Sequence, residues 1–291
     1  MTTPSIPVLP HGAAAAPHHG RRVIVAWLVL SAIATPLVGF LLGPAIRPGH
    51  STVEAAQQVR DNTVLTVVIT PVFCLLAVFF AYALVVFRAR GAAVEDGPAD
   101  RGDSGIQVLW IVITSAIVLF LAGFGTFELL QTGAGGGQGP SPVAVPSGSA
   151  HDRLQVQVIG QQWAFTYRYP SYGGLETPHL VLPAGRTIEF HVTSLDAVHS
   201  FWAYELGVKA DANPGVDNVA YVTLKGPRRF QIRCAELCGL WHGYMSDVGE
   251  VVPPAQFADW IEKQQAEFAP VAKYLPPYAK TYLPDPQRRA G

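Results

Sequence analysis

Charged residues are scarce in this sequence: lysine, arginine, aspartate and glutamate make up 14% of its 291 residues, where a globular chain carries roughly 25%. The formal net charge is −1, and we expect no nucleic-acid partner. Part of a chain this poor in charge is expected to lie in lipid.

Several cofactor and catalytic motifs are also missing. The sequence has no glycine-rich phosphate loop, no Gly-x-Ser-x-Gly segment and no Cys-x-x-Cys-His motif for haem attachment. A haem attached through that motif would therefore have to belong to a separate protein.

Three long uncharged runs stand out instead, over residues 23–46, 62–87 and 105–127. Each is long enough to cross a hydrocarbon core of roughly 30 Å as a helix, so we expect three membrane spans. The first run follows Arg21 and Arg22 and also resembles a secretory signal. Its length exceeds the roughly 7–15 apolar residues of a signal, which favours a retained helix over a cleaved one.

Basic residues indicate the orientation of the spans. Five of them lie before the first run or after the second: Arg21, Arg22, Arg88, Arg90 and Arg101. The loop between these two runs has only Arg47 and Arg60. Loops rich in lysine and arginine stay on the cytoplasmic side of the membrane. We expect a multi-pass protein of the cell (plasma) membrane whose chain after the third span lies on the periplasmic or extracellular side.

Composition divides the chain further. We expect a disordered cytoplasmic tail over residues 1–22, a transmembrane region over 23–130 and a Gly/Pro/Ser linker over 131–150. Alternating apolar residues at 154–159, 187–192 and 220–224, separated by turn signals, predict a β-sandwich or barrel over 151–253. A helix at 255–267 and a tail complete residues 254–291, which makes the expected fold a membrane-anchored α+β protein.

Two scarce residue types converge on one segment, Cys234-Ala-Glu-Leu-Cys-Gly-Leu-Trp-His-Gly-Tyr-Met245, although the chain has only three cysteines and two methionines. Thiolate, imidazole and thioether are ligands that select copper, and His199 offers a second imidazole upstream. One cysteine would predict a single blue copper ion, whereas two can bridge a pair of ions. A disulfide between Cys234 and Cys238 is the alternative.

The pattern Cys-x-Glu-x-Cys-x-x-x-His-x-x-Met resembles the loop that binds the dinuclear copper centre, CuA, in the cytochrome c oxidase subunit II family. The resemblance extends to residues 160–169, 196–202 and 207–215 and to a preceding pair of membrane helices. It implies a cupredoxin-type β-sandwich.

The resemblance also implies a division of ligands. Cys234 and Cys238 would bridge two copper ions, one capped by His199 and Met245 and the other by His242 and the backbone carbonyl of Glu236. Three further roles follow from it: the Glu236 carboxylate would share a magnesium or manganese ion with subunit I, Trp163 would be where the electron enters, and Asp196 and Asp211 would be docking candidates for cytochrome c.

The implied function is to accept electrons from cytochrome c and pass them to haem in subunit I, where oxygen is reduced to water and protons are translocated. The implied partners are subunit I, other oxidase subunits, cytochrome c and membrane lipid. Departures from the family pattern are Gln107, where relatives often have a glutamate near a proton-uptake route, Val216 in place of arginine, and Phe165 in place of a second tryptophan.

Three other functions compete with this one. A quinol oxidase subunit II shares the architecture but lacks the copper ligands, which are intact here. A copper subunit of a nitric oxide reductase-type complex fits the same residues. A membrane-tethered copper-binding protein would not need Trp163 or docking carboxylates.

Overall fold

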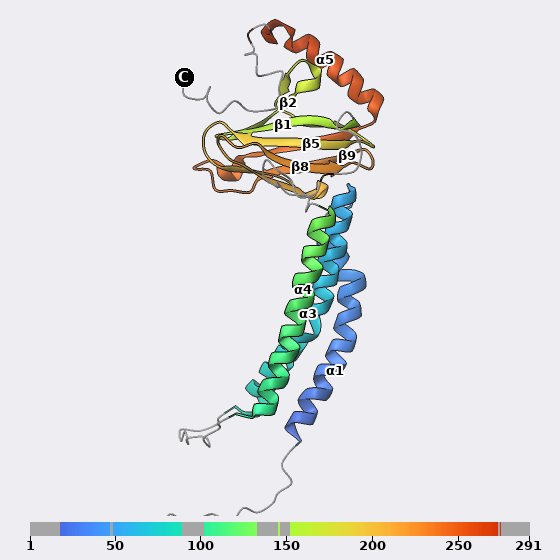
Figure 1. Ribbon diagram of the computed structural model, residues 1–291, viewed down its shortest axis with the longest axis vertical. Helices are drawn as coiled ribbons and strands as arrows, with labels where there is room; N and C mark the ends of the chain where they lie inside the picture. The colour runs from blue at the N-terminus through green and yellow to red at the C-terminus, as the bar shows by residue number, and fades with distance from the viewer. Residues whose placement is uncertain are drawn as a thin grey trace, which may run out of the picture.

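The computed structural model describes residues 18–46, 49–88, 102–132, 145, 152–272 and 274. Long helices form a stalk, and a β-sandwich head sits at one end of it (Figure 1). This arrangement confirms the expected fold class. The expected tail up to residue 17, Arg47, the loop with Arg90 and Arg101, most of the linker and nearly all of the C-terminal tail lie outside the described residues.

The first span is α1 (His19–Leu37), which continues through a π-helical turn, η1 (Val38–Leu42), into α2 (Gly43–Ile46). The wide turn begins two residues after Pro36. The helix begins at His19 rather than at residue 23. It runs beside α3 (Val53–Val86), and the Trp27 Nε1–H donates to the Pro71 carbonyl at 2.8 Å.

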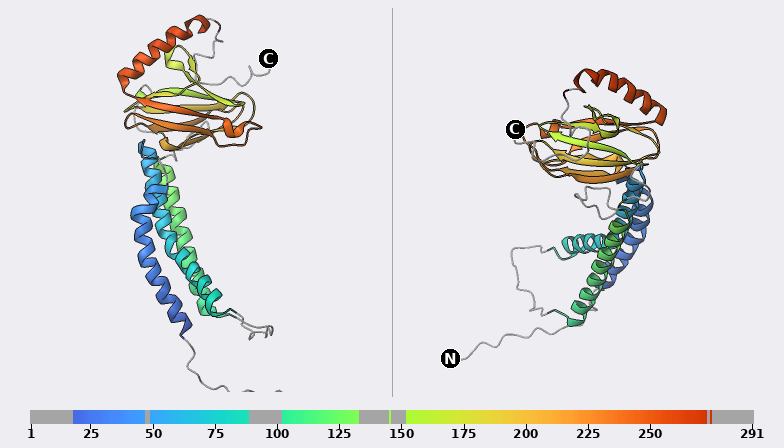
Figure 2. Two further views of the ribbon diagram at one scale, coloured as in Figure 1. Left: turned by 180° about the vertical axis from the view of Figure 1, so that it is seen from behind. Right: turned by 45° about the horizontal axis from the view of Figure 1, so that its top comes forward.

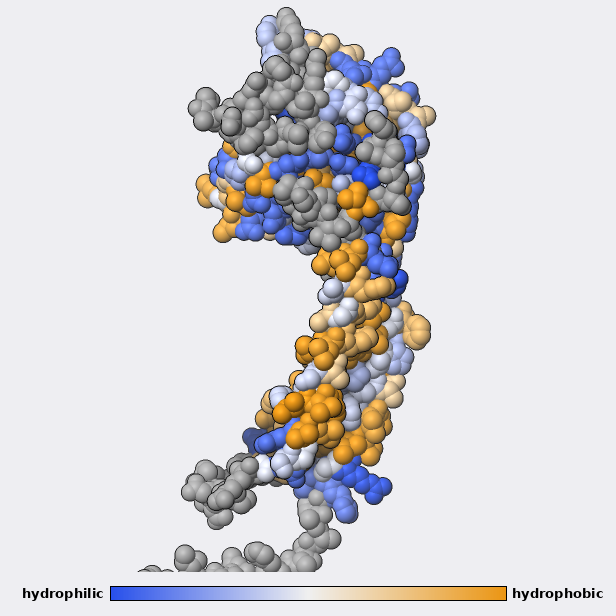
Figure 3. Space-filling view, viewed as in Figure 1, coloured by the Kyte–Doolittle hydropathy of each residue, from blue (hydrophilic) through white to orange (hydrophobic). Residues whose placement is uncertain are grey.

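The second and third spans are α3 and α4 (Ser104–Thr132). Within the part of the chain that the structure describes, three helical segments are long and apolar enough to cross a membrane: His19–Ile46, Val53–Val86 and Ser104–Gln131. The prediction of three spans is confirmed. Apolar side chains cover much of the helical surface (Figure 3), as expected of helices that face lipid or other apolar helices.

The head consists of two five-stranded sheets packed face to face (Figure 1). One sheet has the order β3-β2-β1-β5-β8, with β1 and β5 parallel; its strands are Leu175–Thr177, Ala164–Tyr169, Leu154–Gln161, Thr187–Ser194 and Asn218–Thr223. The other has the order β4-β10-β9-β6-β7; its strands are Val181–Pro183, Ser246–Val252, Arg228–Cys234, His199–Ala203 and Val208–Ala212. Alternate residues of both sheets fill the shared core, including Phe190, Phe201 and Phe230.

Helix α5 (Pro254–Ala272) lies on the side of the head away from the stalk (Figures 1 and 2). Its Trp260 packs edge-on against Tyr169, with ring centroids 5.5 Å apart. Tyr169 is the last residue of β2, whereas Phe165 near the start of β2 lies 6.4 Å from the His199 ring. The α5 contact and the potential metal ligands therefore occupy opposite ends of this strand.

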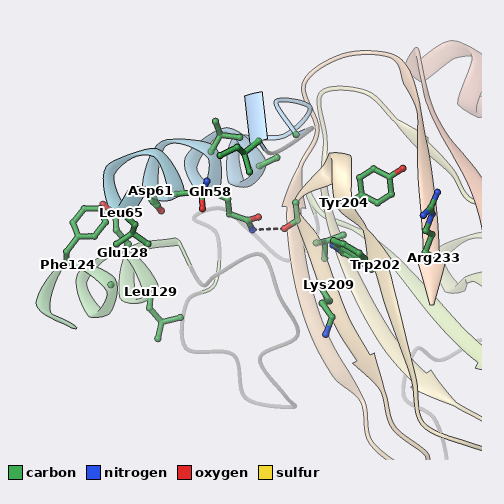
Figure 4. Close-up of a pocket in the computed structure, with 18 residues that line it drawn as sticks. Gln58, Asp61, Leu65, Phe124, Glu128, Leu129, Trp202, Tyr204, Lys209 and Arg233 are labelled. Atoms are coloured by element: carbon green, nitrogen blue, oxygen red, sulfur yellow. Dashed lines mark hydrogen bonds between the residues drawn. The ribbon is translucent and has the colours of Figure 1, made fainter. Parts of the chain in front are cut away.

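The stalk contacts the head through the first turn of α3. The Thr52 hydroxyl accepts from the Ala55 N–H at 2.9 Å and donates to the Leu206 carbonyl at 2.7 Å. The Glu54 carboxylate accepts from the Thr223 N–H at 2.7 Å. Figure 4 shows Gln58 bonded to the Gly207 carbonyl beside a groove of about 960 Å³ between stalk and head. We call this set of contacts the joint.

Candidate metal centre

The potential ligands meet because of strand pairing. Strand β6 begins at His199 and pairs with the end of β9, with Phe201 opposite Cys234. The Cys234 N–H donates to the Met245 carbonyl at 2.9 Å and closes the loop between β9 and β10. We call residues 234–245 the metal loop.

The sulfur and nitrogen atoms of this loop lie close together. Cys234 Sγ is 3.7 Å from Cys238 Sγ and 3.9 Å from His199 Nδ1. Cys238 Sγ is 3.5 Å from His242 Nδ1 and 3.8 Å from Met245 Sδ. Both cysteines are free thiols, since a disulfide requires about 2.05 Å between sulfurs. The arrangement does not favour the alternative of a disulfide.

The donor set fits copper. Ligand atoms of His199, Cys234 and Cys238 all lie within 4.8 Å of one another, and the three residues are buried. Burial raises the pKa of Cys238 to about 11, and the adjacent Cys234 thiol adds to the shift. A bound cation would supply the positive charge that both thiolates need, and soft sulfur with imidazole nitrogen is the ligand chemistry of copper.

The His199 imidazole is held by a carboxylate. Its Nε2 lies 2.8 Å from Asp196 Oδ1, which leaves Nδ1 facing the Cys234 sulfur. Such carboxylate contacts fix the orientation of histidine ligands. Burial acts to raise the pKa of Asp196, but hydrogen bonds from His199 and from the Gln162 and Ala197 N–H groups outweigh it, and the pKa is lowered. The docking role predicted for Asp196 stays a prediction beside this contact.

Trp163 lies against the metal loop. Its Nε1–H donates to the Cys238 carbonyl at 3.3 Å, and Gln162 Nε2 donates to the same oxygen at 2.8 Å. Gln162 was not among the predicted site residues. Its place beside Trp163 was the only sequence signal for it, because a glutamine carries no metal chemistry of its own.

The remaining predicted residues lie at the edge of the cluster. The Glu236 carbonyl is 3.3 Å from Cys234 Sγ, while the residue itself is exposed. Asp211 on β7 accepts from the Ser200 hydroxyl at 2.7 Å and lies 3.4 Å from Lys209 Nζ. The described part of the chain gathers no second group of three His, Cys, Asp or Glu side chains, so other ligands of an ion at Glu236 would come from elsewhere.

Comparison with known proteins agrees with this site. Residues 175–252 match the family model for the periplasmic domain of cytochrome c oxidase subunit II. Cytochrome c oxidase subunit 2 of Synechocystis sp. is 28% identical, with 75% of this chain and 80% of the relative aligned. The Bacillus subtilis protein of the same name is also 28% identical, over 82% of this chain and 68% of the relative.

A solved structure is similar to the head. The periplasmic domain of cytochrome oxidase subunit II (CoxB) of Bradyrhizobium japonicum is 30% identical, with 43% of this chain and 99% of that chain aligned and a TM-score of 0.40.

Three apolar spans followed by a cupredoxin-type sandwich with a sulfur-rich cluster define a membrane-anchored protein of the cupredoxin class. The chain belongs to the cytochrome c oxidase subunit II family. It is thus a subunit of a cytochrome c oxidase, and its head is a periplasmic domain.

Proposed function

We propose that this subunit accepts electrons from cytochrome c at a dinuclear copper centre and passes them to haem in subunit I, where oxygen is reduced to water and protons are translocated. The observation that carries the proposal is the convergence of two free thiols with imidazole and thioether groups in one buried cluster. The proposed ligands are His199, Cys234, Cys238, His242, Met245 and the Glu236 carbonyl.

Copper supplies one-electron redox chemistry when it is bound. The contribution of the chain is to hold the ligands in place before the metal arrives. The Asp196 carboxylate orients His199, and the Cys234–Met245 backbone bond closes the metal loop at its base. Ligands that are already positioned move little when the charge of the centre changes, which keeps electron transfer fast.

Trp163 is the proposed point where the electron enters. Its indole contacts the Cys238 carbonyl directly, so the ring is one hydrogen bond away from a proposed ligand. Glu236 is proposed to share a magnesium or manganese ion with subunit I, because its exposed carboxylate is a hard ligand suited to such ions. Gln107 in the first turn of α4 cannot titrate, and proton uptake is proposed not to depend on it.

Optical and EPR spectra of the full-length chain, purified in detergent and loaded with copper, test the centre. Two copper ions per chain, a purple colour and a delocalised mixed-valence EPR signal are expected. Cys238→Ser should abolish these features, whereas Cys74→Ser, in α3 and far from the metal loop, should retain them. A blue spectrum with one copper ion, or no thiolate-to-copper absorption, would overturn the assignment.

The assembled complex tests the reaction. With reduced cytochrome c as donor it is expected to consume oxygen, and the rate should fall to background when Cys238→Ser is incorporated. Turnover with nitric oxide but not with oxygen would instead identify a nitric oxide reductase-type complex.

A further inference from the structure

Gln162, in the turn between β1 and β2, contacts both segments that supply the proposed ligands. Its backbone N–H donates to Asp196 Oδ2 at 2.7 Å, and Asp196 in turn holds the His199 ring. Its side chain reaches the metal loop, where Nε2 donates to the Cys238 carbonyl at 2.8 Å. One residue of the sandwich therefore connects the segment of His199 with the segment of Cys238.

Two donors converge on the Cys238 carbonyl. The Trp163 Nε1–H donates to this oxygen at 3.3 Å, which is longer than the 2.8 Å from Gln162 Nε2. A carbonyl oxygen has two lone pairs and can accept both hydrogen bonds. Because the Gln162 contact has the length of a strong N–H to oxygen bond and the Trp163 contact does not, the amide of Gln162 is the group that fixes the direction of this carbonyl.

The backbone after Cys238 leaves room for both donors. Gly239 has φ 118°, a conformation that residues with a side chain rarely adopt. A Cβ built there would lie 3.0 Å from Gln162 Nε2 and 3.4 Å from Trp163 Nε1. The metal loop thus turns the bare side of a glycine toward the two donors, which supports a specific contact between Gln162 and this part of the loop.

A hydrogen bond at this carbonyl bears on the chemistry of the site. Hydrogen bonding around a cysteine ligand tunes the reduction potential of copper. The carbonyl oxygen of Cys238 carries partial negative charge, which disfavours the state of a nearby metal that holds the additional electron. The Gln162 N–H places partial positive charge against that oxygen and offsets this effect. Loss of the donor would therefore make the metal harder to reduce.

We propose that Gln162 is a positioning residue that holds the Cys238 carbonyl toward Trp163 and raises the reduction potential of the copper centre. This inference rests on the proposed function, because it requires copper at the metal loop. Only the contact with Cys238 depends on the Gln162 side chain, since the contact with Asp196 uses the backbone N–H. A substitution at this position therefore removes the first contact and retains the second.

A redox titration of the full-length chain, purified in detergent and loaded with copper, tests this role. Gln162→Met keeps the length of the side chain but has no donor for the Cys238 carbonyl. The equilibrium constant for reduction by a mediator of known potential is expected to fall by about threefold or more, a change in the range that one hydrogen bond contributes. The copper content and the purple colour should be those of the wild type.

Two further variants serve as controls. Gln265→Met on α5 is matched to the test variant, because Gln265 Nε2 also donates to a backbone carbonyl, that of Tyr172, at 3.0 Å. Its reduction potential should equal that of the wild type. Gln162→Lys returns a donor to the original position, and its reduction potential is expected to be at or above the wild-type value.

The outcomes separate this inference from the proposed function. An unchanged potential in Gln162→Met, or an equal fall in Gln265→Met, would overturn the role of Gln162. If Gln162→Met does not retain copper, Gln162→Lys decides, and a potential below that of the wild type in this variant overturns the role as well. A wild-type chain that binds copper without the purple colour would instead refute the proposed copper centre itself.

Discussion

Asp196 shows how much one side chain in this head depends on its folded surroundings. In the sequence it is an acidic residue three positions before His199, and it was predicted to face a partner. In the fold its two oxygens hold the His199 ring and the backbone of Gln162 and Ala197. Its contact with the proposed ligand is the one that matters for the metal centre.

Replacing this carboxylate should weaken copper binding. Asp196→Asn removes the charge that orients His199, and copper affinity is expected to fall by about tenfold or more, as when outer partners of metal ligands are lost. Competition with a chelator of known affinity measures it. The control is Asp259→Asn, at an exposed residue of α5; equal affinities for both variants would contradict a positioning role.

A buried charged cluster on β5 links stability to pH. His191 lies between two carboxylates, with Nδ1 2.8 Å from Asp217 Oδ2 and Nε2 3.1 Å from Glu189 Oε1. Burial acts to lower the pKa of His191, but these two carboxylates outweigh it and raise the pKa above 6.5. The hydrogen bond from His191 lowers the pKa of Glu189 below 4.5, against the effect of burial.

The signs of these pKa shifts define the pH range in which the cluster stabilises the head. A raised histidine pKa contributes stability that is fully present below pH 6.5 and is lost as pH rises through the folded value; a lowered glutamate pKa contributes stability that is present above pH 4.5 and is lost on acidification. The cluster therefore stabilises most between these values.

His191→Gln should remove the loss of stability that the wild-type head shows as pH rises. The urea unfolding free energy of the wild-type head, followed by tryptophan fluorescence, is expected to decline as pH is raised above 6.5, and the variant should lack that decline. His179→Gln serves as the control, because its imidazole is largely exposed and contributes little through its contact with Asp247. A parallel decline in all three proteins would exclude His191 as the cause.

At the scale of elements, the packing of η1 and α2, the end of the first span, against α3 depends on close backbone approach. A Cβ added at Gly43 would lie 2.8 Å from Thr63 Cγ2, and one at Gly39 would lie 3.3 Å from Val67 Cγ2. Small residues at such contacts let membrane helices pack tightly. The sequence predicted the spans themselves from their apolar length but carried no sign of which faces would touch.

A larger residue at this contact should separate the two helices. Gly43→Leu is expected to cost about 1–3 kcal/mol, as overpacking of a filled interior does. Thermal unfolding in detergent measures the loss. Gly123→Leu on α4 is the matched control, since no atom lies within 4 Å of a Cβ built there; an equal loss in the control would show that the glycine itself, and not the contact, is responsible.

At the scale of the whole molecule, the joint sets how the head sits on the stalk. Gly207 has φ 70°, and a Cβ there would be 2.7 Å from Ala55 Cα in the first turn of α3. Helix α3 begins at Val53, well before the apolar run starts at residue 62. These extra turns carry Thr52 and Glu54 to their partners in the head.

Gly207→Ala should loosen the joint. The new methyl group cannot coexist with Ala55, so the first turn of α3 moves and the Thr223 N–H loses its bond to Glu54. Faster hydrogen exchange at Thr223 is the expected result. Gly173→Ala separates the steric clash from backbone strain, because Gly173 has φ 74° but no neighbour within 4 Å. Equally fast exchange at Thr223 in this control would point to backbone strain alone.

The sequence by itself determined the features that depend on neighbouring residues: three apolar spans, alternating strands and the spacing of cysteine, histidine and methionine in one loop. The tertiary structure alone decided the contacts between distant segments, such as Asp196 with Gln162, Trp163 with Cys238 and Glu54 with Thr223. The physical reason is that a buried polar group needs a hydrogen-bond partner, and a long chain offers many possible partners. The register of the sheets and the length of α3 decide which partner is within reach, and both are set only when the core packs.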